Sequence, residues 1–179
     1  MILFFLVGVI GVIIALLFKR SLLNMIPDDH SWVIKLRNRQ WFSNYWLAGA
    51  FLFCLNGVLF FGTLLILYAL IYLFIPFFHL LVMLFAVIGS ILFWLIIHKA
   101  WCGIKQNRWK LGVIGSGFYL ILTSVFVYMY ATLEPTYPGE DMFMKGMGLF
   151  LAIIVTTVAC ITCFVITGFS HKSQLPYQT

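Results

Sequence analysis

Two cysteines three residues apart, Cys160 and Cys163, lie in the uncharged stretch TTVACITCFVIT. A C-x-x-C pair can carry out thiol–disulfide exchange or supply two zinc ligands. On a helix, positions i and i+3 share one face, so the two thiols would point the same way. Both reactions need a thiolate, however, and the surrounding Ile, Phe and Val side chains favour the neutral, unreactive thiol.

A zinc site is the second interpretation of this pair. Cys102 and His98 end another apolar stretch at about the same depth, and His171 follows just past the stretch that holds the pair. Thiolates and imidazoles are the ligands that zinc prefers. These ligands would come from three separate segments, and no second paired motif fixes their geometry. We therefore expect no metal and no other cofactor.

A third interpretation is helix packing. Small side chains recur along one face of the same stretch: Gly148, Ala152, Thr156, Cys160 and Cys163. Small residues at this spacing let neighbouring helices approach closely in lipid, where cysteine acts as a small hydrophobic residue. We expect this seam to hold helices together, either within the chain or between copies of it.

Other polar groups are rare inside the apolar stretches. Asn56 is the only amide there, and we expect it to hydrogen-bond across helices or to a backbone carbonyl. No charged residue or histidine lies near the middle of a stretch, where ion-coupled transporters and proton relays place one. No nucleophile has an acid–base partner at a matching depth, so we expect the protein not to be an enzyme.

The composition indicates which elements must position these residues. Of 179 residues, 64% are hydrophobic and only 9% are charged, whereas soluble domains carry about 25% charged residues. A helix crosses the hydrocarbon core of a bilayer with about 20 apolar residues. We therefore predict an all-α, polytopic transmembrane bundle that forms a single domain, followed by a disordered tail over 170–179. The predicted spans are about 1–18, 47–73, 78–97, 111–131 and 146–169.

Basic residues are concentrated on one side of this topology. All of the 11 lysines and arginines except Lys145 fall in the segment after the first span, the loop after the third, or the tail. Because basic loops remain in the cytoplasm, we expect the N-terminus outside and the C-terminus inside. The long first connection also mixes tryptophan with basic residues, which predicts a short amphipathic helix along the headgroups. The predicted cytoplasmic basic face comprises Lys35, Arg37, Arg39, Lys105, Arg108 and Lys110.

This layout favours a non-catalytic integral membrane component that acts through contacts. We expect homo-oligomers through the small-residue seam, and a basic face that binds anionic lipid headgroups or a cytosolic or membrane protein partner. Nucleic acid is not an expected partner, because the basic segments are short and lie against the bilayer. Accessory subunits and small bacterial immunity or defence proteins of the inner membrane share this size and layout. The alternative is a channel or carrier for a neutral or apolar solute.

Overall fold

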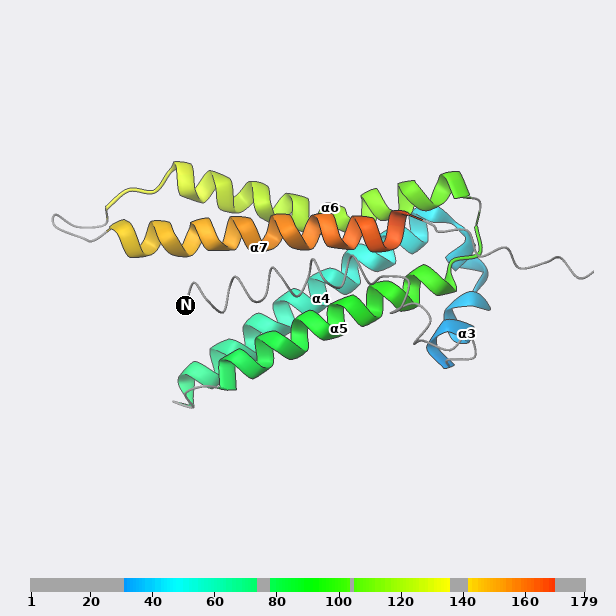
Figure 1. The fold of residues 1–179 in the computed structure, drawn as a ribbon, viewed down its shortest axis with the longest axis horizontal. Helices are drawn as coiled ribbons and strands as arrows, with labels where there is room; N and C mark the ends of the chain where they lie inside the picture. The colour runs from blue at the N-terminus through cyan, green and yellow to red at the C-terminus, as the bar shows by residue number, and fades with distance from the viewer. Residues whose placement is uncertain (1–30, 74–77, 104, 136–141, 170–179) are drawn as a thin grey trace, which may run out of the picture.

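The computed structural model describes residues 31–73, 78–103, 105–135 and 142–169. Within these residues the fold is all-helical, with no strand (Figure 1). The predicted first span, 1–18, and the predicted tail, 170–179, lie outside the described residues. The elements are α3 (Ser31–Arg37), the 3-10 helix η1 (Gln40–Ser43), α4 (Tyr45–Tyr72), α5 (Phe78–Ala100), α6 (Lys105–Ala131) and α7 (Met142–Gly168).

Helices α4, α5, α6 and α7 are each long and apolar enough to cross a membrane. They contain 23 to 28 residues, or about 35–42 Å at 1.5 Å per residue, which exceeds a hydrocarbon core of about 30 Å. These four helices correspond to the last four predicted spans. The excess length places their ends among the headgroups unless the helices tilt.

The start of α6 differs from the sequence prediction. We predicted a loop up to residue 110, whereas the helix begins at Lys105 and includes the whole segment KQNRWK. This segment contains no glycine or proline, and Lys, Gln and Arg are good helix formers. Arg108 and Lys110 are therefore held on the first two turns of a rigid helix.

Helix α3 and η1 form part of the long connection, where we predicted a short amphipathic helix. The Val33 side chain is buried, whereas Trp32 and Ile34 on either side of it are exposed. Phe42 of η1 is also buried, with its ring centroid 6.1 Å from that of Trp101. Through these contacts both short helices are anchored against α4 and α5.

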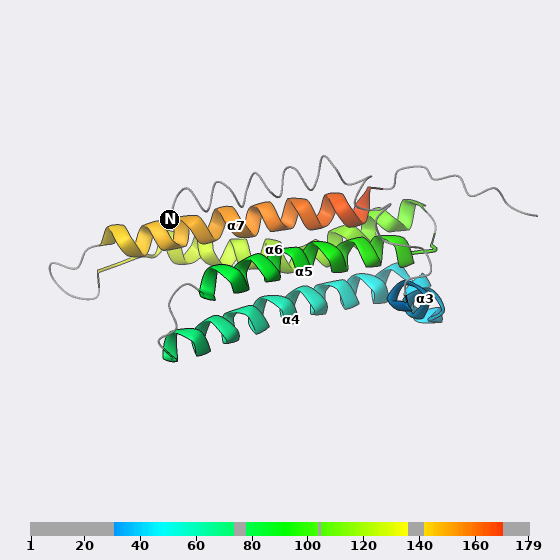
Figure 2. The same cartoon turned by 60° about the horizontal axis from the view of Figure 1, so that its bottom comes forward.

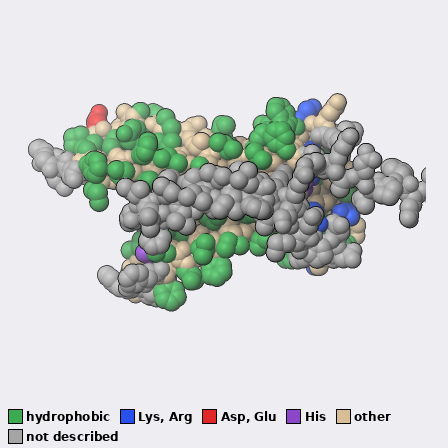
Figure 3. Space-filling view, in the orientation of Figure 1, with side chains coloured by type: hydrophobic (Ala, Val, Ile, Leu, Met, Phe, Trp, Pro, Cys, Tyr) green, Lys and Arg blue, Asp and Glu red, His purple; other side chains and the backbone are tan. Residues whose placement is uncertain are grey.

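The four long helices form two antiparallel hairpins, α4–α5 and α6–α7 (Figures 1 and 2). Helix α3 lies at the end of the bundle where α4 and α6 begin and where α5 and α7 finish. Lysine and arginine side chains gather at this end, and the acidic side chain in view lies at the other (Figure 3). We call this the basic end; its described basic residues are Lys35, Arg37, Arg39, Lys99, Lys105, Arg108 and Lys110.

Burial of the described side chains is concentrated in the half of the bundle next to the basic end. The buried residues of α4 all lie between Ala48 and Asn56, and those of α5 between Trp94 and Ala100. Those of α7 lie between Thr156 and Gly168. In the other half, large apolar side chains such as Tyr72 are exposed, and the two hairpins diverge in Figure 1. Exposed apolar surface of this kind is stable when lipid covers it.

Candidate functional site

Asn56 joins all four long helices. Its side chain is fully buried. Its Oδ1 atom accepts a hydrogen bond from Trp94 Nε1 of α5 at 2.8 Å. Its Nδ2 atom donates to the carbonyl oxygen of Gly115 in α6 at 3.0 Å and to Cys163 Sγ of α7 at 3.6 Å. Every polar atom of the side chain thus has a partner, and we call this arrangement the Asn56 node.

Close packing of α4 on α6 makes the node possible. A Cβ atom on Gly115 would collide with the Leu52 side chain. A Cβ atom on Gly49 would lie 2.9 Å from two carbons of Ile114. Because both positions are glycine, the helices approach closely enough for the Asn56 amide to reach a backbone carbonyl. Small residues at a helix contact therefore bring a polar interaction within range.

The predicted seam on α7 is divided between two environments. Thr156 is buried, and its Oγ1 atom accepts a hydrogen bond from Thr123 Oγ1 of α6 at 2.9 Å. Cys160 Sγ donates to the Ser116 carbonyl oxygen at 3.6 Å. These residues, together with Cys163 at the node and the half-buried Ala152, lie on the packed side. Gly148 is exposed, and no described atom lies within 4 Å of a Cβ built there. Its packing against a second copy stays a prediction.

The residues of the alternative zinc interpretation lie in different surroundings. Cys163 is buried beside Asn56, whereas Cys102 is exposed after α5, and its Sγ atom donates to the Ala100 carbonyl oxygen at 3.6 Å. His98 is buried near the end of α5. In the described part of the chain, no three His, Cys, Asp or Glu side chains come together as a metal site would require. His171 lies outside the described residues.

Two arginines of the predicted basic face form hydrogen bonds to helix ends. Arg37 Nη2 donates to the Lys99 carbonyl oxygen of α5 at 3.3 Å. Arg108 donates through Nε to the Thr167 carbonyl oxygen of α7 at 3.3 Å, and through Nη2 to the His98 carbonyl oxygen. The last carbonyls of a helix have no partner within it and favour cations. These arginines therefore connect α3 to α5, and α6 to both α5 and α7.

Sequence analysis did not detect this capping role. A count of basic residues treats every arginine as a surface charge, whereas Arg108 is only partly exposed and bonds to two other helices. The one feature of the sequence that hints at capping is the position of Arg108, on the same side of the predicted topology as the ends of the spans 78–97 and 146–169. That signal is weak, because only the fold brings Thr167 and His98 to the same arginine.

Two lysines of the predicted basic face lie near aromatic rings. Lys35 Nζ is 6.0 Å from the ring centroid of Trp32, and Lys110 Nζ is 5.2 Å from that of Tyr45. Arg39 is exposed, and Lys105 begins α6. The only acidic residue in the described ranges is Glu134, which follows α6 at the opposite end. No described carboxylate therefore neutralises the basic end.

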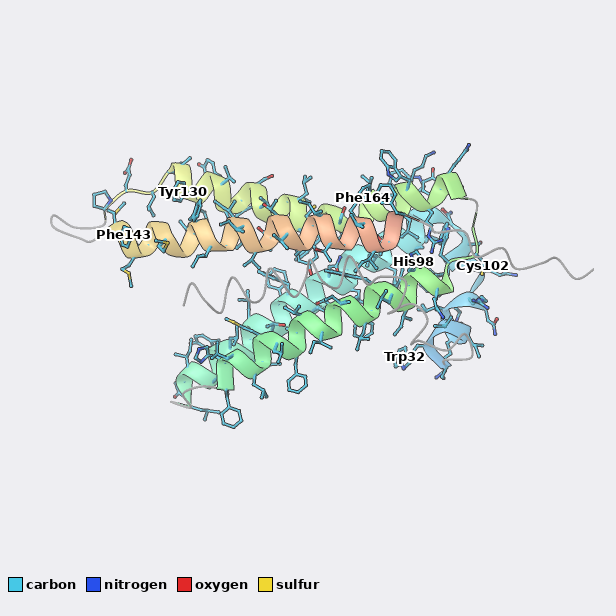
Figure 4. The ribbon with its side chains drawn as sticks, in the orientation of Figure 1. Trp32, His98, Cys102, Tyr130, Phe143 and Phe164 are labelled. Atoms are coloured by element: carbon cyan, nitrogen blue, oxygen red, sulfur yellow. The ribbon has the colours of Figure 1, made fainter. Side chains whose placement is uncertain are left out.

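Aromatic side chains lie toward both ends of the bundle (Figure 4). Figure 4 shows Trp32, His98, Cys102 and Phe164 toward the basic end, with Tyr130 and Phe143 toward the other.

Comparison with protein-family profiles, curated proteins and solved structures gives no match. The class of protein is thus set by the structure itself. Its four long apolar helices fit an integral membrane protein.

Proposed function

We propose that the protein is a non-catalytic component of the bacterial inner membrane that binds a partner protein through its basic end. In this proposal the basic end lies in the cytoplasm and residues 1–18 supply a fifth span, so that the N-terminus is outside. The separation of lysine and arginine from the acidic side chain supports this orientation, because positively charged segments remain on the cytoplasmic side.

The observation that carries the proposal is the exposed surface of α3 and η1. Trp32 is 59% exposed and Trp41 is 38% exposed. We call the exposed residues Trp32, Lys35, Arg39 and Trp41 of these two short helices and the turn between them the α3 face. Tryptophan and arginine are over-represented among the residues that contribute most to binding at protein interfaces. A membrane sensor, an anchor or an immunity-type subunit would each use such a surface.

The backbone beneath the α3 face is well anchored. Val33 and Phe42 are buried, and Arg37 donates a hydrogen bond to the end of α5. A surface whose shape is already formed loses little conformational entropy on binding. The α3 face can therefore bind a partner without rearrangement of the bundle.

The test compares variants at the two ends of the bundle. The tagged full-length protein is purified in mild detergent from its native membrane, and retained proteins are identified by mass spectrometry. A specific partner should be retained by the wild type, lost with Trp32→Ala and Lys35→Glu, and kept with Lys145→Glu, the matched control at the opposite end. The proposal fails if the α3-face variants retain the same proteins as the wild type at equal membrane levels.

A channel or carrier for a neutral solute is the alternative function. The polar side chains that could line such a path already have partners: Thr123 bonds to Thr156, and Asn56 bonds to the Trp94 indole and to the Gly115 carbonyl oxygen. These bonds satisfy the polar groups without a solute, which favours a structural role for them. Solute flux through the purified protein in liposomes would support the carrier instead.

A further inference from the structure

A second surface at the basic end is separate from the α3 face and consists of aromatic residues around one lysine. The ring centroids of Tyr45 and Trp46 lie 5.8 Å apart at the start of α4. Lys110 of α6 holds its Nζ atom 5.2 Å from the Tyr45 ring. Trp109 directly precedes Lys110, and its ring centroid lies 5.8 Å from that of Phe164 in α7. We call this surface of α4, α6 and α7 the girdle.

The girdle lies where the apolar helices end. Tyr45 and Trp46 are the first two residues of α4, and Trp109 and Lys110 lie in the second turn of α6. Trp46 is 61% exposed and Trp109 is 55% exposed. Tryptophan and tyrosine at the ends of membrane spans lie at the headgroup level, where one part of the ring is in apolar surroundings and the other is hydrated. The girdle thus has the depth of lipid phosphates.

The charge of Lys110 remains available to a ligand. A ring face attracts the ammonium group and fixes its position, but it removes neither the positive charge nor the N–H donors. Arg108, two residues before Lys110, directs its guanidinium to the carbonyl oxygens of Thr167 and His98. No carboxylate in the described ranges lies at this end, since Glu134 is at the other. The exposed ammonium group of Lys110 makes a negatively charged group the complement of the girdle.

The surface next to the girdle is apolar. Val113, three residues after Lys110 on the same helix, is exposed, and so is Ala50, four residues after Trp46. Residues at these spacings lie on one helix face. An ammonium group above exposed apolar side chains matches a molecule with a phosphate above acyl chains, whereas a cytosolic protein would not reach past the headgroups to the apolar part.

We propose that the girdle binds the headgroup of an anionic phospholipid, with Lys110 contacting the phosphate and Trp46 and Trp109 flanking the glycerol region. Zwitterionic lipids also carry a phosphate, but their own cation offsets it. Selectivity for anionic lipid therefore depends on net charge. One basic group near an anionic surface changes binding about fivefold at moderate ionic strength.

The experiment uses the full-length protein in detergent with equimolar phosphatidylglycerol and phosphatidylcholine of the same acyl chains. Native mass spectrometry measures the ratio of the two lipids bound. Lys110→Gln should lower the ratio of bound phosphatidylglycerol to bound phosphatidylcholine about fivefold. Lys110→Arg should keep it, and Lys145→Gln, at the other end of the bundle, should leave it unchanged. Raising the salt concentration before transfer should reduce the wild-type preference.

Three outcomes would overturn the proposal: an unchanged ratio in Lys110→Gln, an equal fall in Lys145→Gln, or a fall in Lys110→Arg as large as in Lys110→Gln. If Lys110→Gln loses a co-purifying protein but keeps its lipid ratio, the girdle is a protein site and the lipid proposal is wrong. Helicity and thermal unfolding of each variant show that the fold is intact. Because the α3 face is not altered, the result does not depend on the proposed partner protein.

Discussion

Replacement of Asn56 tests whether the Asn56 node holds the bundle together. Asn56→Leu keeps nearly the same shape but removes the hydrogen bonds to Trp94 and Gly115. Hydrogen bonds between membrane helices contribute about 0.6 kcal/mol each, and the buried Trp94 N–H left without an acceptor costs about 1–3 kcal/mol more. We therefore expect the free energy of unfolding to fall by about 2–4 kcal/mol.

The assay is unfolding of the purified protein in mixed micelles, with helicity followed as the denaturing detergent fraction rises. Trp94→Phe should also destabilise, because Asn56 Oδ1 then loses its donor. The double variant should lose less than the sum of the two, by about 1–3 kcal/mol, since both members of the Asn56–Trp94 bond are then removed together. Ser124→Ala is the control, because this exposed hydroxyl bonds only within its own helix, to Leu120. Strict additivity, or an Asn56→Leu effect no larger than the control, would refute the reasoning.

Three further predictions concern capping, packing and topology. Arg108→Gln should lower the free energy of unfolding by about 1–3 kcal/mol in the same assay, because two helix ends lose a charged donor; an Arg108→Gln protein as stable as wild type would contradict this. The double variant Cys160→Ala, Cys163→Ala should keep its fold and its partner binding. Cys160→Phe should lower the free energy of unfolding by about 1–3 kcal/mol, because it overpacks the seam against α6. Loss of binding in the alanine variant at normal membrane levels would instead support thiol chemistry. A reporter fused after Thr179 should be cytoplasmic and one inserted near Gly139 external, and the reverse pattern would exclude the proposed orientation.

The helical architecture follows from composition, because a long apolar run in a bilayer must satisfy its own backbone hydrogen bonds. The four long apolar helices could therefore be predicted from the length and the apolar composition of their sequences. Their ends could not. The charge of the segment before residue 111 favours a loop, but charged residues also continue a helix readily beyond the apolar stretch, and α6 begins at Lys105. Periodicity defines which residues share a face but not where a helix crosses into the headgroups.

The partners of the buried polar groups were beyond sequence reasoning. An isolated amide in an apolar span predicts a cross-helix hydrogen bond, but nothing near Asn56 identifies Trp94, 38 residues away, as its donor. The same limit applies to Arg108, whose carbonyl partners lie on two other helices. Both arrangements depend on how helices pack, and packing is decided by the three-dimensional fit of small residues such as Gly115.

The uneven distribution of burial has a mechanical consequence. Described side chains are buried mainly in the half of the bundle that contains the Asn56 node and the arginine caps, so this half resists deformation. In the opposite half, large apolar side chains of α4 and α5 are exposed, as side chains that face lipid are. A thinner or thicker bilayer therefore changes the tilt of these outer helix segments at small cost, while the node stays closed. The protein can thus adapt to membranes of different thickness by bending at one end, so that the geometry of the basic end is unaffected.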